Sequence, residues 1–370
     1  MYTSMEIKGY RGLSSLRLDG LTRINLLVGT NNSGKTSILE CIGLLHAAGD
    51  HRMLRSVLDA RGEWLVDEDR GRMYDVRHLF AGHDTTGHVS LWGERAGYRL
   101  RGAQTATAEL LIEADSTDPL EPPEFSFDES EALSEDHGGA LVWRASDTDG
   151  EFRAGLFAEG LLPPQSLMRG GRPINGDVPP VQFIGTGGLT SEQVSRTFGA
   201  AVMTETEDRA VEALQIIEPR VERIATVPFG RWMPRSDSHG GIFVRLRGLD
   251  ARVPLGSLGE GMRRMLGLAL SLARARGGVL LVDEIDTGLH YSVMQKMWKM
   301  IVERSQALDV QVFATTHSRD CYESLGSIAE ADAPAPGRVS IHRIETDRAH
   351  TVGFSEHQVA IVGERELEVR

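Results

Sequence analysis

The sequence predicts an α/β fold built on a parallel or mixed sheet, and two observations support this prediction. In the C-terminal third, short apolar runs alternate with segments of helical periodicity, an order that produces parallel strands joined by right-handed crossovers. Near the N-terminus, the apolar run Ile24–Val28 is followed by a glycine-rich loop and then by apolar residues at helical spacing. No heptad pattern runs for several turns, so no long coiled coil is expected.

We place the strands at short apolar runs that have turn-forming residues on either side. They are expected at 5–10, 15–18, 24–28, 88–92, 98–101, 109–112, 141–144, 181–184, 242–246, 279–282 and 310–314. Helices are expected from about residue 35, after a capping box formed by Thr204 and Glu207, after Gly261, from about residue 292 and after Ser318. The helix after the capping box should bury a stripe formed by Val211, Leu214 and Ile217.

The composition is that of a globular chain in which acidic residues outnumber basic ones. Its 370 residues include 40 Lys and Arg against 53 Asp and Glu. The net charge of −13 excludes a broadly basic nucleic-acid coat but not a local basic groove. Residues 113–136 hold ten acidic residues and no Lys or Arg. This pattern is typical of a solvated insertion, and a specific acidic docking site is the less favoured alternative.

We expect no targeting signal from this sequence. The first residues include Glu6, Lys8 and Arg11 and lack the apolar core of a signal peptide. No run approaches the roughly 18 apolar residues of a transmembrane helix. Cys41 and Cys321 lie far apart and outside any metal-like cluster, as in a reduced chain. We therefore expect a cytoplasmic protein with no membrane partner.

A phosphate-binding loop is the strongest motif. Residues 29–36, GTNNSGKT, match G-x-x-x-x-G-K-[ST] in full, with a strand before and a helix after. The glycines let backbone N–H groups wrap phosphates, Lys35 reaches the β- and γ-phosphates, and the Thr36 hydroxyl is a ligand for Mg²⁺. The residues predicted to bind ATP here are Gly29, Asn31, Asn32, Ser33, Gly34, Lys35, Thr36 and Ser37.

A second motif is an apolar strand that ends in two carboxylates, Asp283 and Glu284. Alone this pattern is weak, because any surface strand can end in acids. Together with the phosphate-binding loop it predicts that Asp283 holds the Mg²⁺ shell and that Glu284 polarises the attacking water.

Three further pieces complete the pattern. Ser257-Leu-Gly-Glu-Gly261 stands directly before an apolar helix and predicts a second anion-binding nest, with a simple glycine-rich helix cap as the alternative. Asp286 follows the acidic pair, and Thr315-Thr-His-Ser318 ends the next strand. A histidine at the position of His317 could contact a γ-phosphate and report its loss.

With these motifs the chain resembles a P-loop ATPase of the ABC type, in the branch that includes SMC, RecF and the overcoming-lysogenisation-defect (OLD) nucleases. Within this branch it is most similar to stand-alone AAA-type proteins of bacterial defence and toxin-like modules. The matching pieces run in the family's order from Met5–Gly12, through the Walker A loop, the signature at 257–261 and the Walker B strand, to the D-loop residue Asp286 and the switch residue His317.

The resemblance implies a mechanism in which two heads enclose two ATP molecules. In this picture Ser257 and Gly259 contact the γ-phosphate held by the other head. Glu284 is the general base and His317 the switch, while Asp286 couples the two sites. Arg11 matches an N-terminal arginine often placed near the nucleotide. A homodimer or higher homo-oligomer is therefore expected.

The resemblance also suggests a division into four segments. Residues 1–112 would form the N-terminal part of lobe I, with the Walker A loop, and 113–138 an acidic insertion. Residues 139–256 would supply strands and a helical lobe II. Residues 257–370 would carry the signature, Walker B, D-loop and switch.

Some features depart from the family. The signature is SLGEG rather than LSGGQ, which argues against a transporter head, and no clear Q-loop glutamine follows the first helix. OLD nucleases carry a Toprim domain after the switch, for which this chain leaves little room, so it is not expected to cut DNA alone. His78, His83 and His88 recur every five residues, a spacing that makes a metal site the less favoured interpretation.

The favoured function is an ATP-hydrolysing protein that regulates or scaffolds a separate effector, with a nuclease of an anti-phage defence system as the expected partner. The alternative is a RecF-like ATPase that binds DNA in repair or recombination. A transporter head is the least favoured reading.

Overall fold

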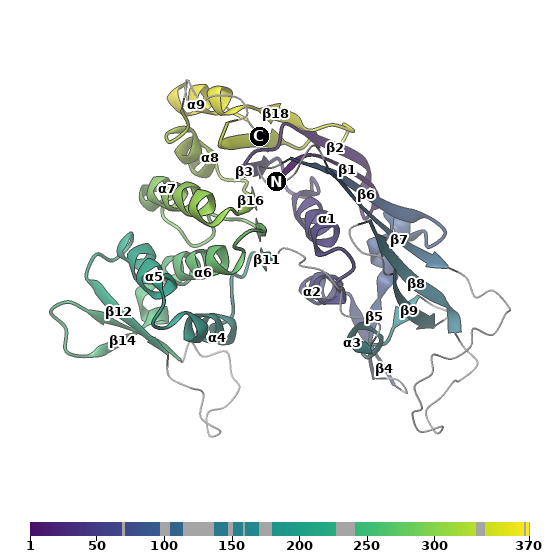
Figure 1. The fold of residues 1–370 in the computed structure, drawn as a ribbon, viewed down its shortest axis with the longest axis horizontal. Coiled ribbons are helices and arrows are strands. Elements are labelled where there is room, and N and C mark those ends of the chain that lie inside the picture. The colour runs from purple at the N-terminus through teal and green to yellow at the C-terminus, as the bar shows by residue number, and fades with distance from the viewer. Residues whose placement is uncertain are drawn as a thin grey trace. The chain divides into compact units, whose positions relative to one another are not determined.

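The computed structural model describes residues 1–68, 71–96, 104–113, 137–146, 151–157, 160–169, 180–226, 241–330, 337–365 and 368–369. The chain divides into two compact units (Figure 1). The first unit contains Met1–Ser4, Leu18–Leu39 and Pro179–Arg370, and the second contains Met5–Arg17 and Glu40–Val178.

A six-stranded sheet forms the centre of the first unit. Its order is β11-β15-β16-β3-β17-β18, and all neighbours are parallel except β18, which runs antiparallel to β17. The strand β3 is buried at every position, as expected for a parallel strand with both faces covered. The strands span Ile24–Val28 (β3), Val181–Ile184 (β11), Val279–Val282 (β15), Gln311–Thr315 (β16), Val339–Arg343 (β17) and Val352–Phe354 (β18). The predicted mixed α/β sheet is thus confirmed.

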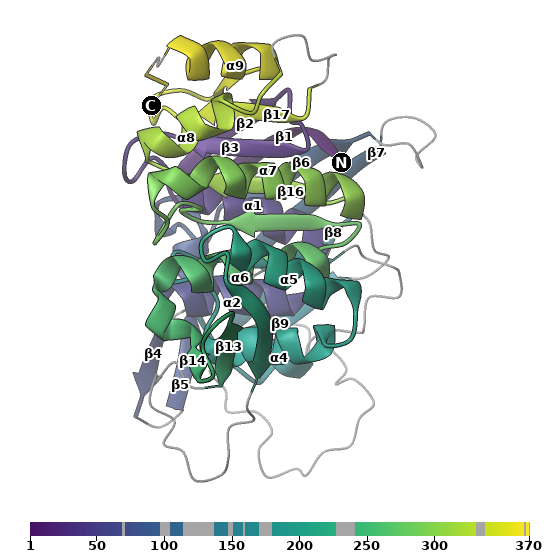
Figure 2. The same cartoon turned by 90° about the vertical axis from the view of Figure 1, so that its left-hand side faces the viewer.

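Helices of the first unit pack on one another in sequence order. Contacts join α5 to α6, α6 to α7, α7 to α8 and α8 to α9, and Figure 2 shows this succession. Trp298 of α7 is fully buried, and its indole N–H donates to the carbonyl of Cys321 on α8 at 3.0 Å. The helices span Ser191–Ala201 (α4), Glu205–Gln215 (α5), Glu260–Arg274 (α6), Tyr291–Leu308 (α7), Arg319–Gly326 (α8) and Glu356–Arg365 (α9), and the short turn η3 spans Leu255–Leu258.

A small antiparallel sheet completes the first unit. Its strands are β12 (Val221–Thr226), β13 (Ile242–Leu246) and β14 (Arg252–Pro254). One face packs on α4 and α5, and its apolar side chains join the same core as the large sheet. These strands and helices fall within the segment 139–256, for which a helical lobe remains a prediction.

The second unit is built on a nine-stranded sheet of order β2-β1-β6-β7-β8-β9-β10-β5-β4. The strands β6 to β9 pair antiparallel. The helix α1 begins in the first unit and from Glu40 onward belongs to the second. The strands span Tyr2–Tyr10 (β1), Leu13–Asp19 (β2), Trp64–Asp67 (β4), Gly71–Asp75 (β5), His88–Arg95 (β6), Gln104–Glu113 (β7), His137–Ala145 (β8), Glu151–Phe157 (β9) and Leu161–Leu162 (β10). The helices are α1 (Lys35–Ala47), α2 (His51–Arg61), η1 (Val76–Leu79), η2 (Ala81–His83) and α3 (Ser166–Arg169).

The division of the chain differs from the four consecutive segments suggested by the sequence. The strands β8 and β9 fall in the segment 139–256 that was expected to form the helical lobe. Instead β8 pairs with β7 over six residue pairs, from Ala108↔Ala145 to Glu113↔Ala140, and β9 pairs with β8. This ladder ties both strands to the second unit. The expected strand at 98–101 and almost all of the acidic insertion lie outside the described residues.

The capping box was predicted at the wrong helix. Thr204 does cap α5, but its hydroxyl accepts from the N–H of Thr206, and the Glu207 carboxylate accepts from Met203. The reciprocal pair of bonds is made instead at the start of α4, between Thr190 and Gln193. The apolar stripe predicted for α5 is one residue too long, because Ile217 lies beyond the end of the helix.

The two cysteines, Cys41 and Cys321, are buried, and neither forms a disulfide.

Among the described helices, none combines the length and the apolar character needed to cross a membrane.

A buried histidine on β17 makes stability depend on pH. Burial lowers the pKa of His342 to about 4, against an opposing attraction from Asp19. Its Nε2 contacts the Ser340 hydroxyl at 2.9 Å. The unfolded histidine has a pKa of about 6.5, so between pH 6.5 and 4 the unfolded chain binds more protons than the folded chain. The stabilisation is complete above pH 6.5 and is lost as the pH falls toward 4.

We expect His342→Gln to remove this component. Between pH 7 and 4.5 the wild-type chain should lose about 2 to 3 kcal/mol more unfolding free energy than the variant, measured by urea unfolding at both pH values. His350→Gln, which changes an exposed histidine, is the control and should behave as wild type. Equal pH dependence in all three chains would contradict the assignment.

Candidate active site

The predicted site residues meet at one edge of the six-stranded sheet. The strands β3, β15 and β16 run parallel, with Ala314 opposite both Leu26 and Val282. The carboxyl ends of parallel strands lie at the same edge. The loop after β3, the acidic pair after β15 and the residues after β16 therefore leave the sheet beside one another.

The backbone of the Walker A loop depends on its first glycine. Gly29 has φ +152°, and a Cβ atom added there would lie 2.8 Å from the carbonyl oxygen of Ile344 and 2.9 Å from the Ser33 hydroxyl. Any larger residue would displace the loop or the backbone at Ile344, which directly follows β17. Gly34 and Asn32 adopt left-handed conformations, with φ 89° and 61°.

The ammonium group of Lys35 closes the loop. Its Nζ donates to the carbonyls of Gly29 at 2.9 Å and Thr30 at 2.6 Å. Burial lowers the pKa of Lys35, while the negative charges of Asp283 and Glu284 oppose this shift. The ammonium group is thus held by two backbone carbonyls of the loop. A phosphate oxygen could take the place of either carbonyl as its acceptor.

The Asp283 carboxylate is fixed by two hydroxyl groups. Thr36 donates to its Oδ2 at 2.8 Å, and Thr315 donates to its Oδ1 at 2.6 Å. The residue is only 5% exposed. The Thr315 hydroxyl also accepts from the backbone N–H of Glu284 at 2.8 Å. Sequence reasoning singled out the run 315–318 for its histidine and missed this threonine.

Glu284 has a strained backbone and an accessible carboxylate. Its φ of 46° lies in the left-handed region, which is unfavourable for a residue with a side chain. The side chain is 38% exposed, and its Oε1 lies 3.7 Å from Nδ1 of His317. Thr287 donates to its Oε2 at 3.3 Å. The structure therefore brings the predicted base and the predicted switch residue together.

Asp286, the predicted D-loop residue, is held by Thr316, which precedes the predicted switch residue His317. Thr316 donates to its Oδ1 at 2.7 Å and accepts from the N–H of Ser318 at 2.9 Å. The Thr316 hydroxyl therefore links Asp286 to the residue that caps α8.

Arg264 is a site residue that the sequence analysis missed. It lies on α6, just after the signature, and is 4% exposed. Its Nη2 donates to the carbonyls of Asp283 and Glu284, both at 2.7 Å, and its Nη1 donates to Gly185 at 3.0 Å. Burial lowers the pKa of Arg264, and nearby carboxylates, Asp286 first among them, oppose this shift. The guanidinium thus ties the signature helix to the backbone of the acidic pair.

The signature residues lie on the surface at the start of α6. Ser257 is exposed in η3, and the exposed Gly259, with φ 95°, is the residue before the helix. Further along, a Cβ atom added at Gly261 would lie 2.9 Å from the carbonyl oxygen of Gly288. The signature helix therefore packs directly on the segment after Asp286. In the Walker A loop, Asn31 and Asn32 are exposed and Ser33 and Ser37 are buried.

Arg11 belongs to the second unit. Its Nε donates to Glu40 at 2.8 Å and its Nη2 to Glu63 at 3.0 Å, and the guanidinium is only 12% exposed. Its expected role near a nucleotide stays a prediction. In the same unit Nδ1 of His78 lies 3.0 Å from Nδ1 of His83. Across the described ranges, no three His, Cys, Asp or Glu side chains are grouped to hold a metal ion.

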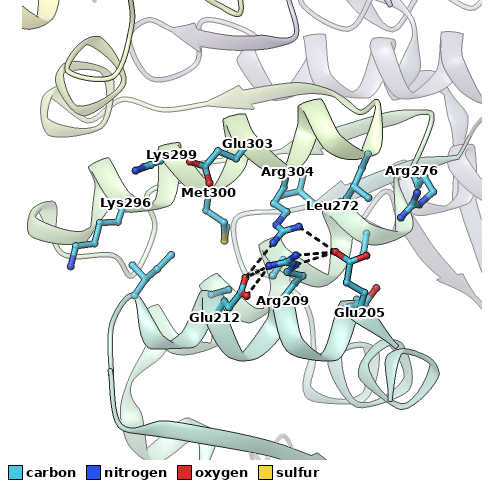
Figure 3. A pocket seen from close by; sticks show the side chains of 16 residues that line it. Glu205, Arg209, Glu212, Leu272, Arg276, Lys296, Lys299, Met300, Glu303 and Arg304 are labelled. Atoms are coloured by element: carbon cyan, nitrogen blue, oxygen red, sulfur yellow. Dashed lines mark hydrogen bonds and ion pairs between the residues drawn. The ribbon is translucent and has the colours of Figure 1, made fainter. Parts of the chain in front are cut away.

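A hollow of about 310 Å³ lies between α5, α6 and α7 of the first unit (Figure 3). Apolar atoms of Leu272 and Met300 line it, and its lining includes none of the predicted site residues. One wall is an ion-pair network in which Arg209 contacts Glu205 at 3.1 Å and Glu212 at 2.7 Å. Arg304 of α7 joins the network at 3.2 Å from Glu212, so this ion pair links α5 to α7.

Together the strand, phosphate-binding loop and helix, with Asp283 and Glu284 ending a parallel strand nearby, define a P-loop ATPase. The signature between the two motifs gives the ABC-type order. The chain belongs to the family described as "AAA domain, putative AbiEii toxin, Type IV TA system", which matches residues 130–320. Residues 1–89 match the family described as "AAA ATPase domain".

The chain is similar to several known proteins at low sequence identity. The chain is 20% identical over 354 residues to a protein of Helicobacter pylori named "ATP/GTP phosphatase", covering 89% of this chain and 88% of that protein. It is 30% identical over 127 residues to the "DNA replication and repair protein RecF" of Shewanella baltica, 34% of each chain. The SMC head domain of Thermotoga maritima superposes with a TM-score of 0.45 at 14% identity, covering 96% of this chain and 98% of that one.

The contacts of Arg264 generate a prediction. Arg264→Met keeps the length of the side chain but leaves the carbonyl of Asp283 without its donor. It also removes one of two donors from the carbonyls of Glu284 and Gly185, which keep the N–H groups of Thr287 and Gly188. We expect a loss of about 2 to 4 kcal/mol of unfolding free energy and a fall in ATP turnover of at least tenfold, measured by urea unfolding and phosphate release.

Arg263→Met is the matched control. Arg263 is the neighbouring residue, its side chain is 20% exposed, and it pairs with Glu260 on the surface of the same helix. We expect this variant to lose less than about 1 kcal/mol. If both variants behaved alike, the guanidinium of Arg264 would have no special role.

Proposed function

We propose that this ATPase binds Mg²⁺–ATP at the Walker A loop, closes around it as a dimer and thereby controls a separate effector protein. The observation that carries the first step is the 2.8 Å hydrogen bond from the Thr36 hydroxyl to the Asp283 carboxylate. It joins the Walker A and Walker B segments through the two oxygen groups that a magnesium ion would use.

The residues at the sheet edge fit such an ion. Mg²⁺ prefers a small number of hard oxygen ligands, and Thr36 and the ordered carboxylate of Asp283 offer them side by side. The bound metal would neutralise phosphate charge. Lys35 would exchange the carbonyls of Gly29 and Thr30 for phosphate oxygens, and its partial burial strengthens that attraction. Ser33, Ser37 and the N–H groups around Gly34 would complete the cradle.

Glu284 is the proposed general base. Its carboxylate is accessible to water, and its orientation is supported by Thr287 on one oxygen and by His317 near the other. The strained backbone supports a functional role, because such conformations persist where the surroundings enforce them. His317 would report the loss of the γ-phosphate from its position beside the base.

A second copy of the chain is proposed to complete the site. Ser257 and Gly259 are exposed at the start of α6, where N–H groups and the helix dipole favour an anion. In a dimer they would meet the γ-phosphate held by the partner. The Gly261–Gly288 contact and the Thr316–Asp286 bond support a role for Asp286 in coupling the two sites.

The effector is proposed to be a nuclease of an anti-phage system. The description of the family as a toxin of a toxin–antitoxin system supports a role in such modules. The name of the Helicobacter relative supports nucleotide hydrolysis as the shared activity. A cytoplasmic location agrees with this role.

The dimer is tested with Glu284→Gln. This variant should bind ATP but hydrolyse it at least 100-fold more slowly, because the base is gone and the phosphate contacts remain. Light scattering with Mg²⁺ and ATP should show twice the mass seen without nucleotide. Lys35→Ala is the control, since it removes the phosphate anchor and should neither bind ATP nor change mass. A mass independent of ATP in the Glu284→Gln chain would contradict the sandwich.

The effector is tested by capture. Glu284→Gln chain purified from its own host cells with Mg²⁺ and ATP should carry a stoichiometric nuclease-like protein, identified by mass spectrometry. The Lys35→Ala chain should retain much less of it. Recovery of the ATPase without a protein partner would contradict the effector role and leave the RecF-like alternative.

A further inference from the structure

The small sheet of the first unit carries an unusual row of arginines. Arg223 on β12 is directly opposite Arg245 on β13, and Arg245 is directly opposite Arg252 on β14. Residues that pair directly in antiparallel strands point to the same face. The three arginine side chains therefore leave the same face of the sheet in one row across all three strands.

This line lies on the solvent face of the sheet. Arg223, Arg245 and Arg252 are exposed, while the next residues along the strands, Ile224 and Val244, are buried in the core. The alternation fixes the orientation, because a shift of one residue would place the arginines in the core.

The row is only partly neutralised by its surroundings. Glu222 reaches Arg245 at 3.3 Å and the neighbouring Arg247 at 3.5 Å. Of the carboxylates in the described ranges, none forms an ion pair with Arg223 or Arg252. Like charges directly opposite one another destabilise a sheet. Three arginines in one row, in a chain of net charge −13, indicate a surface that binds an anionic partner.

The chemistry of this face favours phosphate groups over an acidic protein. Guanidinium groups bind phosphate oxygens in a bidentate manner. The adjacent row on the same face is Ala225, Phe243 and Pro254, and the Phe243 ring lies 5.9 Å from the guanidinium carbon of Arg252. A protein interface has a larger apolar centre, whereas nucleic-acid interfaces are polar and strongly positive.

We infer that the outer face of β12–β14, here called the arginine face, binds the phosphodiester backbone of nucleic acid without reading its sequence. It contains none of the residues assigned to ATP, so this inference does not depend on the proposed function. Arg247, which directly follows β13, adds a fourth arginine near the row, and the Phe243 ring lies beside Arg252.

The test uses the full chain and fluorescence anisotropy with a labelled 30-base-pair duplex and a single strand of the same length. The wild-type chain should bind both at 50 mM salt, without sequence preference. The triple variant Arg223→Gln, Arg245→Gln and Arg252→Gln should bind at least tenfold more weakly. On duplex its log–log salt slope should be shallower by about 3, one unit for each lost phosphate contact.

A second triple variant controls for net charge. Arg52→Gln, Arg144→Gln and Arg196→Gln remove three arginines that already form ion pairs on other surfaces, and binding should stay within twofold of wild type. Replacing the arginine face by lysines should restore most of the affinity, because charge dominates such binding. Phosphate release should be unchanged in the glutamine variant, which shows that the nucleotide site is intact.

Three results would overturn the inference. These are absence of binding by the wild-type chain at 50 mM salt, equal losses in the two glutamine triples, and displacement of the duplex by poly-L-glutamate as effectively as by unlabelled duplex. The last result would instead assign the arginine face to an acidic protein.

Discussion

Asp283 accepts hydrogen bonds from two hydroxyl groups that reach it from the ends of two other strands, and the rest of the site depends on this arrangement. Thr36 arrives with the helix after β3, and Thr315 is the last residue of β16. Both hydroxyls can meet one carboxylate only because β3, β15 and β16 are parallel and in register. The buried sheet thus sets the geometry of the exposed loops, as expected when flexible segments are mounted on a rigid scaffold.

Local signals were enough to predict the parts of the site that are contiguous in sequence. The Walker A loop could be identified because its conformation requires specific residues at fixed offsets, and β3, β11 and β15 because each is a short apolar run. Arg264 and Thr315 could not be assigned. The partners of Arg264 are backbone carbonyls, which leave no trace in the identity of the residues that carry them. The role of Thr315 depends on which strand lies beside β16.

The second unit was predicted less well for the same reason. Its strands β6 to β9 alternate apolar and polar residues, but the pairing that groups them joins segments separated by long stretches of chain. Sequence order suggested that β8 belongs with the helices that follow it. The capping box shows the same limit on a smaller scale. Thr204 and Glu207 have suitable spacing, yet the Glu207 carboxylate accepts from the N–H of Met203, a residue in the left-handed conformation.

The strained backbone of Glu284 has an evolutionary consequence. A left-handed conformation costs a residue with a Cβ roughly 1 kcal/mol or more, whereas glycine adopts it freely and asparagine at little cost. Stability alone would therefore drive this position toward glycine or asparagine, and only selection for the carboxylate opposes that drift. The identity of this single residue in related genomes should separate lineages that still turn over nucleotide from those in which the protein has become a passive binder.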